Sequence, residues 1–540
     1  MTIKKHARQI FVIAASILVS CTLLSYPMQP ASTQATEPPQ IYLPLVSTPE
    51  ICTPTLFRPL PPTLTTESTP EPSEYPSEIF AAPTGSTFYV TINGRENGNG
   101  SLDQPWDLDS ALLNRSQLIK PGDTVLVRGG TYLPQIEPRK FNIKLYGGER
   151  SPITVRAYPG ERVIIDGGIE IYDPNLVFWG FEITNSDTDR VAENQGSSPD
   201  DLTRAGGVGI YAANVKLINN VIHDGRGGIS AFDDAVNAVI YGNISYNNGW
   251  KGPDRGHGHG LYAQNQTGTK IIAENIIFNN FGAYSVHIYR ENGPLCNFDL
   301  IGNITFNNTF LVGGLQPANN INVYENYIYN TTARFGYGST QNGQVSIVGN
   351  RFWNLNSTSL VVKWWNQVTL KNNYIFNNHS TAVDLQNPPT NYPYDWDSNA
   401  YLVNSGTPFR IGTSLHNWTA WRDLTGFDSN GTLERSQPTK TEVFVRPNFY
   451  EPKRGNIIIY NWVKANTVQV DISALGLAMG DQYTLHNAQN FYQNPISGTF
   501  EGKPLDIPMT GWTVAKPVGW SEPLGINTFP TFGVFVLITK

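Results

Sequence analysis

One short pattern recurs through the middle of this 540-residue chain and limits what it can fold into. In each copy, apolar residues are followed by one or two further residues, then by Asn, and then by more apolar residues, as in Leu300-Ile301-Gly302-Asn303-Ile304. The spacings between successive asparagines are 23, 32, 28, 23, 24 and 23. Such a period indicates a solenoid, in which each repeat buries its apolar side by stacking on its neighbours. The asparagines are Asn220, Asn243, Asn275, Asn303, Asn326, Asn350 and Asn373.

Each repeat contains two or three short runs of alternating Val, Ile, Leu, Tyr and Phe, broken by Asn and Gly, without a helical period. The pattern therefore predicts an all-β coil of strands. Stacked coils place equivalent residues about 4.8 Å apart, so the asparagines can bond to one another and to turn backbone. Asn also tolerates the left-handed conformation of a sharp corner. We expect the asparagines to be structural.

The beginning of the coil has its own signature. A strand-like run at Phe88–Thr91 is followed by the Gly/Asn-rich segment Gly94–Ser101, an amphipathic segment Asp107–Leu118, and Pro121-Gly122-Asp123-Thr124-Val125. This order of strand, capping helix and PGDTV strand resembles the right-handed parallel β-helix, pectate-lyase-like superfamily of secreted bacterial carbohydrate-active proteins, over about residues 86–400. The resemblance implies the fold. It does not imply one activity, because the fold hosts lyases, glycosidases, epimerases and adhesins.

The chain begins with a basic segment followed by the apolar stretch Ile10–Leu24. This stretch is shorter than the roughly 20 residues of a spanning helix, so we interpret residues 1–25 as an export signal. The four residues that end at Cys21 resemble the bacterial lipobox, in which this Cys is lipidated; ordinary cleavage near Ala31 or Ala35 is the alternative. Either way, we expect a secreted or cell-surface protein, with membrane contact only through such a lipid.

Residues 26–85 are rich in Pro and Thr, a composition that cannot bury a core and predicts a disordered tether. The three cysteines are Cys21, Cys52 and Cys296, so we expect neither a disulfide framework nor a CxxC metal pair. A net charge of −7 argues against a nucleic-acid partner. An aromatic content of 12% suits sugar binding, although strand packing also uses aromatic residues.

The coil is expected to occupy residues 86–435. Beyond Thr441, short strand-like runs such as Asn456–Trp462 and Thr531–Leu537 predict a small antiparallel β-sandwich over residues 436–540. It resembles the accessory sandwich that ends many secreted carbohydrate-active enzymes. We expect it to cover the open strand edge at the C-terminal end of the coil.

The polar segment Ser186–Ala205 interrupts the coil pattern. A loop of about 20 residues in a compact domain is usually functional, and we expect a lip over a substrate groove. A disordered excursion is the alternative.

Aligning the coils by the apolar residues that should point inward gives one outward column. The inward set is Ile210, Ile229, Leu261, Ile288, Leu315, Val362 and Val383. The coil between Gln316 and Lys363 cannot be aligned in this way. His287, His259 and Arg290 lie beside the column, and Gln264 and Trp364 flank it. The column itself is Tyr211, Ser230, Tyr262, Tyr289, Gln316, Lys363 and Asp384.

This strip carries the groups that β-elimination from a uronic-acid polymer needs. Arg290 or Lys363 can neutralise the uronate carboxylate. His287 or His259, with a pKa near neutrality, can remove the C5 proton. Tyr289 or Tyr262 can protonate the departing oxygen. The predicted substrate-binding residues are Tyr211, Gln264, Gln316, Trp364 and Asp384.

Three other interpretations stay open. A glycoside hydrolase needs two carboxyls about 5–9.5 Å apart. The available acids are Asp233, Asp234, Asp254, Glu291 and Asp384, of which Asp233 and Asp384 are expected to lie several coils apart. Asp233, Asp234 and Asp254 are candidate ligands for Ca²⁺. Finally, the protein can be a noncatalytic surface protein that only binds a polysaccharide, and the rings of the strip can serve packing alone. In every case we expect a monomer.

Overall fold

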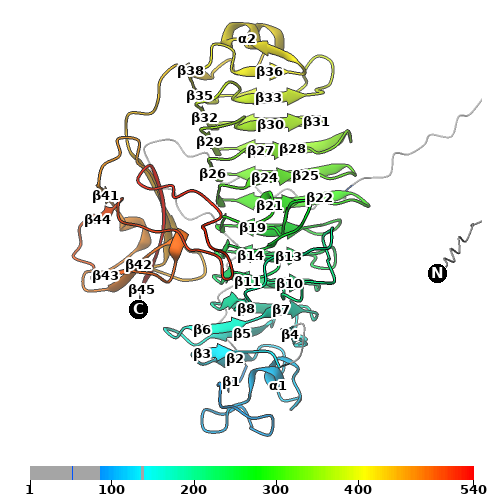
Figure 1. Cartoon of the computed structure of the whole chain (residues 1–540), viewed down its shortest axis with the longest axis vertical. Coiled ribbons are helices and arrows are strands. Elements are labelled where there is room, and N and C mark those ends of the chain that lie inside the picture. Colours follow the sequence, from blue (N-terminus) through cyan, green and yellow to red (C-terminus); the bar gives the residue numbers. More distant parts are fainter. Residues whose placement is uncertain (1–51, 53–84, 136–138, 540) are drawn as a thin grey trace, which may run out of the picture. The chain divides into compact units, whose positions relative to one another are not determined.

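The computed structural model describes residues 52, 85–135 and 139–539, and nearly all of its regular structure is β-strand. Three parallel sheets of 12 strands, here called A, B and C, form a right-handed parallel β-helix, as the sequence predicts. Figure 1 shows the strands stacked in chain order. The export signal, the lipobox and the tether lie outside the described residues except for Cys52. No helix within residues 85–135 and 139–539 is both long and apolar enough to cross a membrane.

Most coils contribute one strand to each sheet, and neighbouring strands are parallel except for the last pair of sheet C. Sheet A contains β1 (Thr87–Val90), β2 (Thr124–Val127), β5 (Ile153–Ala157), β8 (Leu176–Trp179), β11 (Lys216–Ile218), β14 (Val239–Tyr241), β19 (Lys270–Ala273), β22 (Leu295–Ile301), β25 (Ala318–Tyr324), β28 (Asn342–Val348), β31 (Trp365–Lys371) and β34 (Asp395–Asp397). Sheet B contains β3 (Gly130–Tyr132), β6 (Val163–Asp166), β9 (Glu182–Thr184), β12 (Val221–His223), β15 (Ile244–Tyr246), β20 (Ile276–Phe278), β23 (Ile304–Phe306), β26 (Tyr327–Tyr329), β29 (Arg351–Asn354), β32 (Tyr374–Asn377), β35 (Ala400–Val403) and β38 (Thr432–Glu434). Sheet C contains β4 (Lys140–Ile143), β7 (Gly168–Ile171), β10 (Val208–Ile210), β13 (Ile229–Ala231), β18 (Leu261–Ala263), β21 (Tyr284–Ile288), β24 (Thr309–Val312), β27 (Ala333–Phe335), β30 (Leu360–Lys363), β33 (Val383–Gln386), β36 (Phe409–Ile411) and the antiparallel β37 (Ser414–His416).

The asparagines form a buried ladder at the corner between sheets A and B. Asn303 donates from its backbone N–H and from Nδ2 to Oδ1 of Asn326, both at 2.9 Å. Its Nδ2 also donates to the carbonyl of Ile272, and its Oδ1 accepts two bonds from Asn275. The same pattern continues to Asn399, which donates to Asp428. Each corner therefore relies on the next coil for its hydrogen bonds.

The N-terminal cap contains the helix α1 (Leu108–Leu112), with Asp107 accepting a bond from the N–H of Ser110 at 2.9 Å. The helix is shorter than the expected Asp107–Leu118. Asn114 and Gln117 have φ of 47° and 57°, values that end a right-handed helix. The cap is held to the first strands by Asp123, whose carboxylate accepts from the N–H groups of Ser86 and Lys120.

The opposite end of the coil is closed by α2 (Trp418–Thr425). Its Trp421 is fully buried and stacks on Phe409 with ring centroids 4.7 Å apart. The expectation that the C-terminal domain covers this end is therefore wrong, because the segment that directly follows the last coil already supplies the apolar lid.

The C-terminal domain packs on sheet B instead. The outward positions of successive sheet B strands carry a column of aromatic residues that would otherwise be exposed. Phe532 stacks on Tyr329 with ring centroids 4.1 Å apart, and Arg446 pairs with the buried Glu274 at 2.6 Å. The aromatic column comprises Tyr246, Phe278, Phe306, Tyr329, Trp353 and Phe376.

The domain itself is built from antiparallel strands with a separate apolar core. The predicted β-sandwich is not confirmed. The described part of the domain has one sheet of five strands and one of two. A five-stranded sheet contains β39 (Glu442–Pro447), β40 (Gly455–Tyr460), β45 (Phe532–Thr539), β42 (Gln482–Asn487) and β43 (Ile496–Thr499), and β41 (Thr467–Val470) pairs with β44 (Leu505–Pro508). The short helices η2 (Ser473–Leu475) and η3 (Ala488–Asn490) connect strands.

Cys52 and Cys296 form a disulfide, with their Cα atoms 5.9 Å apart. The expectation of no disulfide framework is corrected by this bond. The two residues are 244 positions apart, and sequence spacing alone cannot show that Cys52 meets the beginning of β22. A disulfide is typical of proteins in oxidising compartments.

We expect Asn303→Ala to destabilise the β-helix by about 1–3 kcal/mol, because it leaves buried groups of Asn275 and Ile272 without their partner. Denaturant unfolding measures the change. The control is Asn93→Ala at an exposed position. Equal stabilities of the two variants would contradict a structural role for the ladder.

We expect peptide mapping without reduction to recover Cys52 and Cys296 in one linked peptide pair. After reduction, the same digest should give the two peptides separately. Recovery of both cysteines as free thiols from protein exported by its host would contradict the bond.

Candidate functional site

The outward face of sheet C gathers most of the residues that the sequence singles out. β18 pairs with β21 so that Tyr262 lies directly opposite His287. His259 precedes β18, Tyr284 begins β21, and Tyr289 follows it. We call these five residues the histidine–tyrosine cluster.

The cluster is organised around His287. Its imidazole is stacked between Tyr284, at a centroid distance of 4.3 Å, and Tyr289, at 4.7 Å. His259 meets it edge-on at 4.4 Å, and Tyr262 does so at 5.5 Å. The pairing of neighbouring strands, together with the β-bulge between Tyr284 and Val286, thus brings five rings into contact.

Burial keeps both imidazoles of the cluster neutral. Desolvation, with Arg255 and His257 nearby, lowers the pKa of His259 to about 4. Desolvation and the neighbouring His259 lower the pKa of His287 to about 2. The expectation of histidines that titrate near neutrality is therefore not met in the free protein. Desolvation likewise raises the pKa of Tyr289 to about 12, so this phenol keeps its proton.

The Nδ1 atoms of His259 and His287 are both buried and have no hydrogen-bond partner among the described residues. A buried polar atom without a partner is costly, and other described residues also carry one, among them Trp353 and Trp421 at Nε1. A neutral imidazole has one donor and one acceptor nitrogen. Since both Nδ1 atoms are enclosed, a ligand can contact these imidazoles only at the Nε2 side of each ring.

Two cationic residues of the predicted site differ in their pairing. Arg290 is buried and forms a bidentate pair with Asp233, with both N–O distances 2.8 Å. Lys363, on β30, pairs with no carboxylate within residues 85–135 and 139–539, but it lies three coils from Tyr289, about 14 Å at the usual strand spacing. Arg290 is thus largely neutralised, whereas Lys363 is not.

The sequence interpretation misses Arg334 and Tyr284. Arg334 is the outward residue of β27, the coil that did not align, and it is exposed. Its charge acts on Tyr284, and no carboxylate in the described part of the chain pairs with it. The alternation Ala333-Arg334-Phe335 is the signal that could have placed it, because both flanking residues are fully buried.

The predicted outward column combines two columns that lie on the same face. The first contains Ser230, Tyr262, His287 and Asp384, and the second follows two residues later along each strand. A slip of two residues keeps the face of the sheet but moves the residue along the strand. The second column contains Tyr211, Phe232, Gln264, Tyr289 and Lys363.

Leu315 and Gln316 belong to neither column. Leu315 is exposed, and both residues follow β24 instead of forming part of it. In Phe310-Leu311-Val312 all three residues are apolar and buried, so alternation gives no register there.

The predicted binding residues lie at several levels of the face. Tyr211 is stacked between Tyr172, at 5.2 Å, and Phe232, at 5.0 Å. Gln264 donates to the Tyr262 hydroxyl at 2.7 Å. Trp364 occupies the turn from sheet C to sheet A with φ of 57°.

Asp384 lies four coils from the histidine–tyrosine cluster. It is buried, accepts from Gln386 at 2.7 Å, and pairs with Arg410 at 3.4 Å. Asp384 is therefore held by residues of its own and the following coil, away from the cluster.

The candidate calcium ligands do not come together. Asp233 pairs with Arg290, whereas Asp254 lies on the hairpin of β16 (Trp250–Lys251) and β17 (Gly256–His257), where it bonds to His257 at 2.9 Å. No group of three or more His, Cys, Asp or Glu side chains within residues 85–135 and 139–539 is arranged to hold a metal ion.

The Ser186–Ala205 insertion is ordered by two buried arginines. Arg190 bonds to Asp224 and to the carbonyls of Asn247 and Gly249, and Arg204 donates to the carbonyl of Asp224 at 2.6 Å. The alternative of a disordered excursion is therefore wrong. The insertion packs beside Trp250 at the corner between sheets B and C.

Residues 88–249 match the family described as Pel9A-like, right handed beta helix region. The predicted pectate-lyase-like resemblance is confirmed. Over 89 residues the chain is 37% identical to pectate lyase PEL9 of Emericella nidulans, a match that spans 16% of this chain and 20% of that protein. Such a match concerns the pectate-lyase-like β-helix and leaves the activity of the whole protein to experiment.

Two solved structures are similar to the chain at low identity. The crystal structure of pectate lyase Pel9A aligns with a TM-score of 0.35 at 14% identity, covering 62% of this chain and 78% of that one. The complex of XylC with xylose aligns with a TM-score of 0.39 at 10% identity, covering 84% and 100%. Similarity at this level says nothing about activity.

The low pKa of His287 predicts an acid-sensitive fold. In the unfolded chain its imidazole binds a proton below about pH 6.5, whereas in the folded protein it stays neutral down to about 2. The unfolded state binds more protons in this window, so stability falls as the pH drops below about 6.5. His287→Phe keeps the ring stack and removes the titration. Between pH 7.5 and 5, we expect the parent to lose about 2 kcal/mol more of its unfolding free energy than the variant loses.

Denaturant unfolding at several pH values measures this difference. Other groups titrate in both proteins and cancel, including His223, whose pKa is raised to about 9 between Asp224 and Glu182. Parallel pH profiles of parent and variant would contradict a neutral, buried His287.

Proposed function

We propose that this protein is a carbohydrate-active enzyme that cleaves an acidic, uronic-acid-containing polysaccharide by β-elimination on the outward face of sheet C. The observation that carries the proposal is the histidine–tyrosine cluster, in which two neutral imidazoles contact each other and three phenols. The match of residues 88–249 to a Pel9A-like region and the identity to a pectate lyase support it.

The elimination needs a base at C5 and an acid at O4. An imidazole of His259 or His287 takes the C5 proton, the C5–H electrons form the C4–C5 double bond, and the C4–O bond breaks. A phenol, Tyr289 or Tyr262, gives its proton to the departing oxygen. A bound uronate carboxylate beside the imidazoles favours their protonated form and so raises their low pKa values during turnover.

The carboxylate itself needs a cation. Arg334 suits this role because it is exposed, unpaired with any described carboxylate, and two coils from His287, about 10 Å at the strand spacing. Lys363, one coil further, suits the carboxylate of the next sugar along the chain. Arg290 instead holds Asp233 and so shapes the turn after β13.

A hydrolase is less favoured by the arrangement of acids. Asp233 and Asp384 lie six coils apart, about 29 Å, far beyond the separation that hydrolysis requires. Glu182 and Asp224 both contact His223, but these carboxyls are buried at the border with the C-terminal domain. An exported location also belongs to the proposal, and the Cys52–Cys296 disulfide supports it.

We expect the protein to release products with the ultraviolet absorbance of an unsaturated uronyl end from at least one acidic glycan. The panel contains pectate, alginate, glycosaminoglycans and neutral galactans and glucans, each with and without chelator. His287→Ala and Tyr289→Phe should lower kcat by about 10²–10⁴-fold, as expected for loss of proton transfer. Arg334→Gln should mainly raise KM for the acidic polymer.

His379→Ala, at an exposed position away from the cluster, is the matched control and should keep full activity. New reducing ends without the absorbance would indicate hydrolysis and overturn the elimination. Binding without any product would indicate a noncatalytic surface protein.

A further inference from the structure

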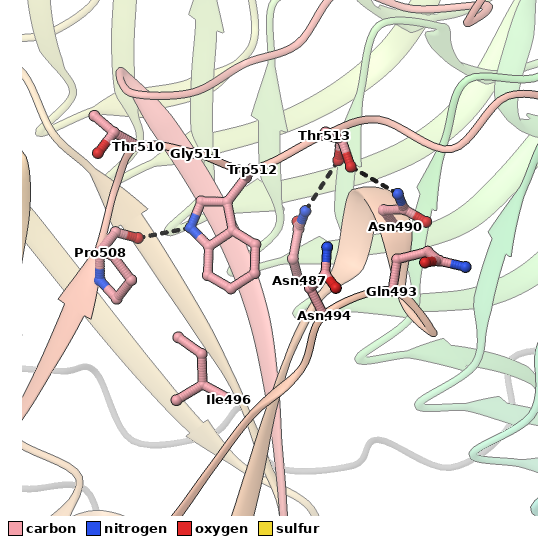
Figure 2. Close-up of a pocket in the computed structure, with 10 residues that line it drawn as sticks. All are labelled: Asn487, Asn490, Gln493, Asn494, Ile496, Pro508, Thr510, Gly511, Trp512 and Thr513. Atoms are coloured by element: carbon pink, nitrogen blue, oxygen red, sulfur yellow. Dashed lines mark hydrogen bonds between the residues drawn. The ribbon is translucent and has the colours of Figure 1, made fainter.

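A second site of different chemistry lies in the C-terminal domain. A pocket of about 170 Å³ opens between the segment that follows β44 and the segment that follows η3. Figure 2 shows Trp512 on one side of it and side-chain amides on the other. None of its ten lining residues is charged.

The indole of Trp512 is fixed from behind. Its Nε1 donates to the carbonyl of Pro508 at 2.7 Å, and its ring packs edge-on against Phe535 at 5.5 Å. The residue is only partly buried, so part of the ring is left to line the pocket. An indole held in this way offers an apolar face at little cost in side-chain entropy.

The amide side is also held in place. Asn487, which is buried, donates to the carbonyl of Thr513 at 3.2 Å, and Asn490 donates to the Thr513 hydroxyl at 2.8 Å. These two bonds fix the segment after Trp512 against η3. The shape of the pocket therefore exists before any ligand binds.

Two further amides remain available to a ligand. Gln493 and Asn494 are exposed, and their side chains make no hydrogen bond to any described residue. Asn494 adopts φ of 51°, which a turn imposes and Asn tolerates. Each amide offers both donors and acceptors, the combination that a sugar hydroxyl needs.

We propose that this pocket binds a single neutral sugar unit of a glycan, with its apolar face on Trp512 and its hydroxyls on the amides of Gln493 and Asn494. A uronic acid is disfavoured because no cation lines the pocket to compensate the carboxylate. The proposal is independent of catalysis on sheet C, since the pocket shares no residue with the histidine–tyrosine cluster.

The test uses the full exported protein and calorimetric or NMR titration with the methyl glycosides of glucose, galactose, xylose and arabinose, and with galacturonic acid. At least one neutral glycoside should bind saturably, more tightly than galacturonic acid. The double variant Gln493→Ala/Asn494→Gly should weaken binding at least about tenfold, since two hydrogen-bonding side chains are lost. Glycine is used at position 494 because it accepts positive φ.

Trp512→Phe should also weaken binding while keeping an aromatic core residue. Gln469→Ala, an exposed amide on β41, is the matched control and should bind as the parent does. His287→Ala should retain binding, which separates this site from sheet C. No saturable binding of any neutral glycoside, or equal binding by the double variant, would overturn the proposal.

Discussion

The structure depends on hydrogen bonds that each coil can make only with its neighbours. At the corner between sheets A and B, Asn275, Asn303 and Asn326 donate and accept along the axis of the β-helix, and all three are fully buried. A buried amide without these bonds would cost more than the coil could recover alone. Stacking at the strand spacing of about 4.8 Å then aligns equivalent side chains into columns. Such columns form the packing interface on sheet B and the candidate site on sheet C.

The same cylinder uses aromatic columns in two different ways. On sheet B, aromatic residues such as Phe278 and Phe306 stack at 4.5 Å and are covered by the C-terminal domain. On sheet C, the phenol of Tyr262 is followed in the next coil by the imidazole of His287. The covered column is a packing interface. The column on sheet C is not part of that interface and carries an imidazole beside a phenol, which makes it the better candidate for ligand binding.

Charge distinguishes these regions as well. Near the C-terminal domain, buried charges are paired, as in Glu274 with Arg446 and Arg190 with Asp224. His223 lies between Asp224 and Glu182, which raise its pKa to about 9. In the histidine–tyrosine cluster, burial without a nearby carboxylate lowers the imidazole pKa values instead. Histidine is thus charged at the domain border, where carboxylates surround it, and neutral on sheet C, where burial dominates.

The sequence by itself determined the coil, its asparagine ladder and the face that carries His287, because these follow from local alternation and a repeated spacing. Only the tertiary structure decided the register along that face, since a slip of two residues leaves alternation unchanged. It also revealed the bond between Cys52 and Cys296, which depends on contact between distant segments. The tertiary structure also decided where the C-terminal domain packs, which is on the aromatic column of sheet B. Local pattern fixes which side of a strand a residue takes, whereas long-range contacts fix its neighbours and hence its pKa and its role.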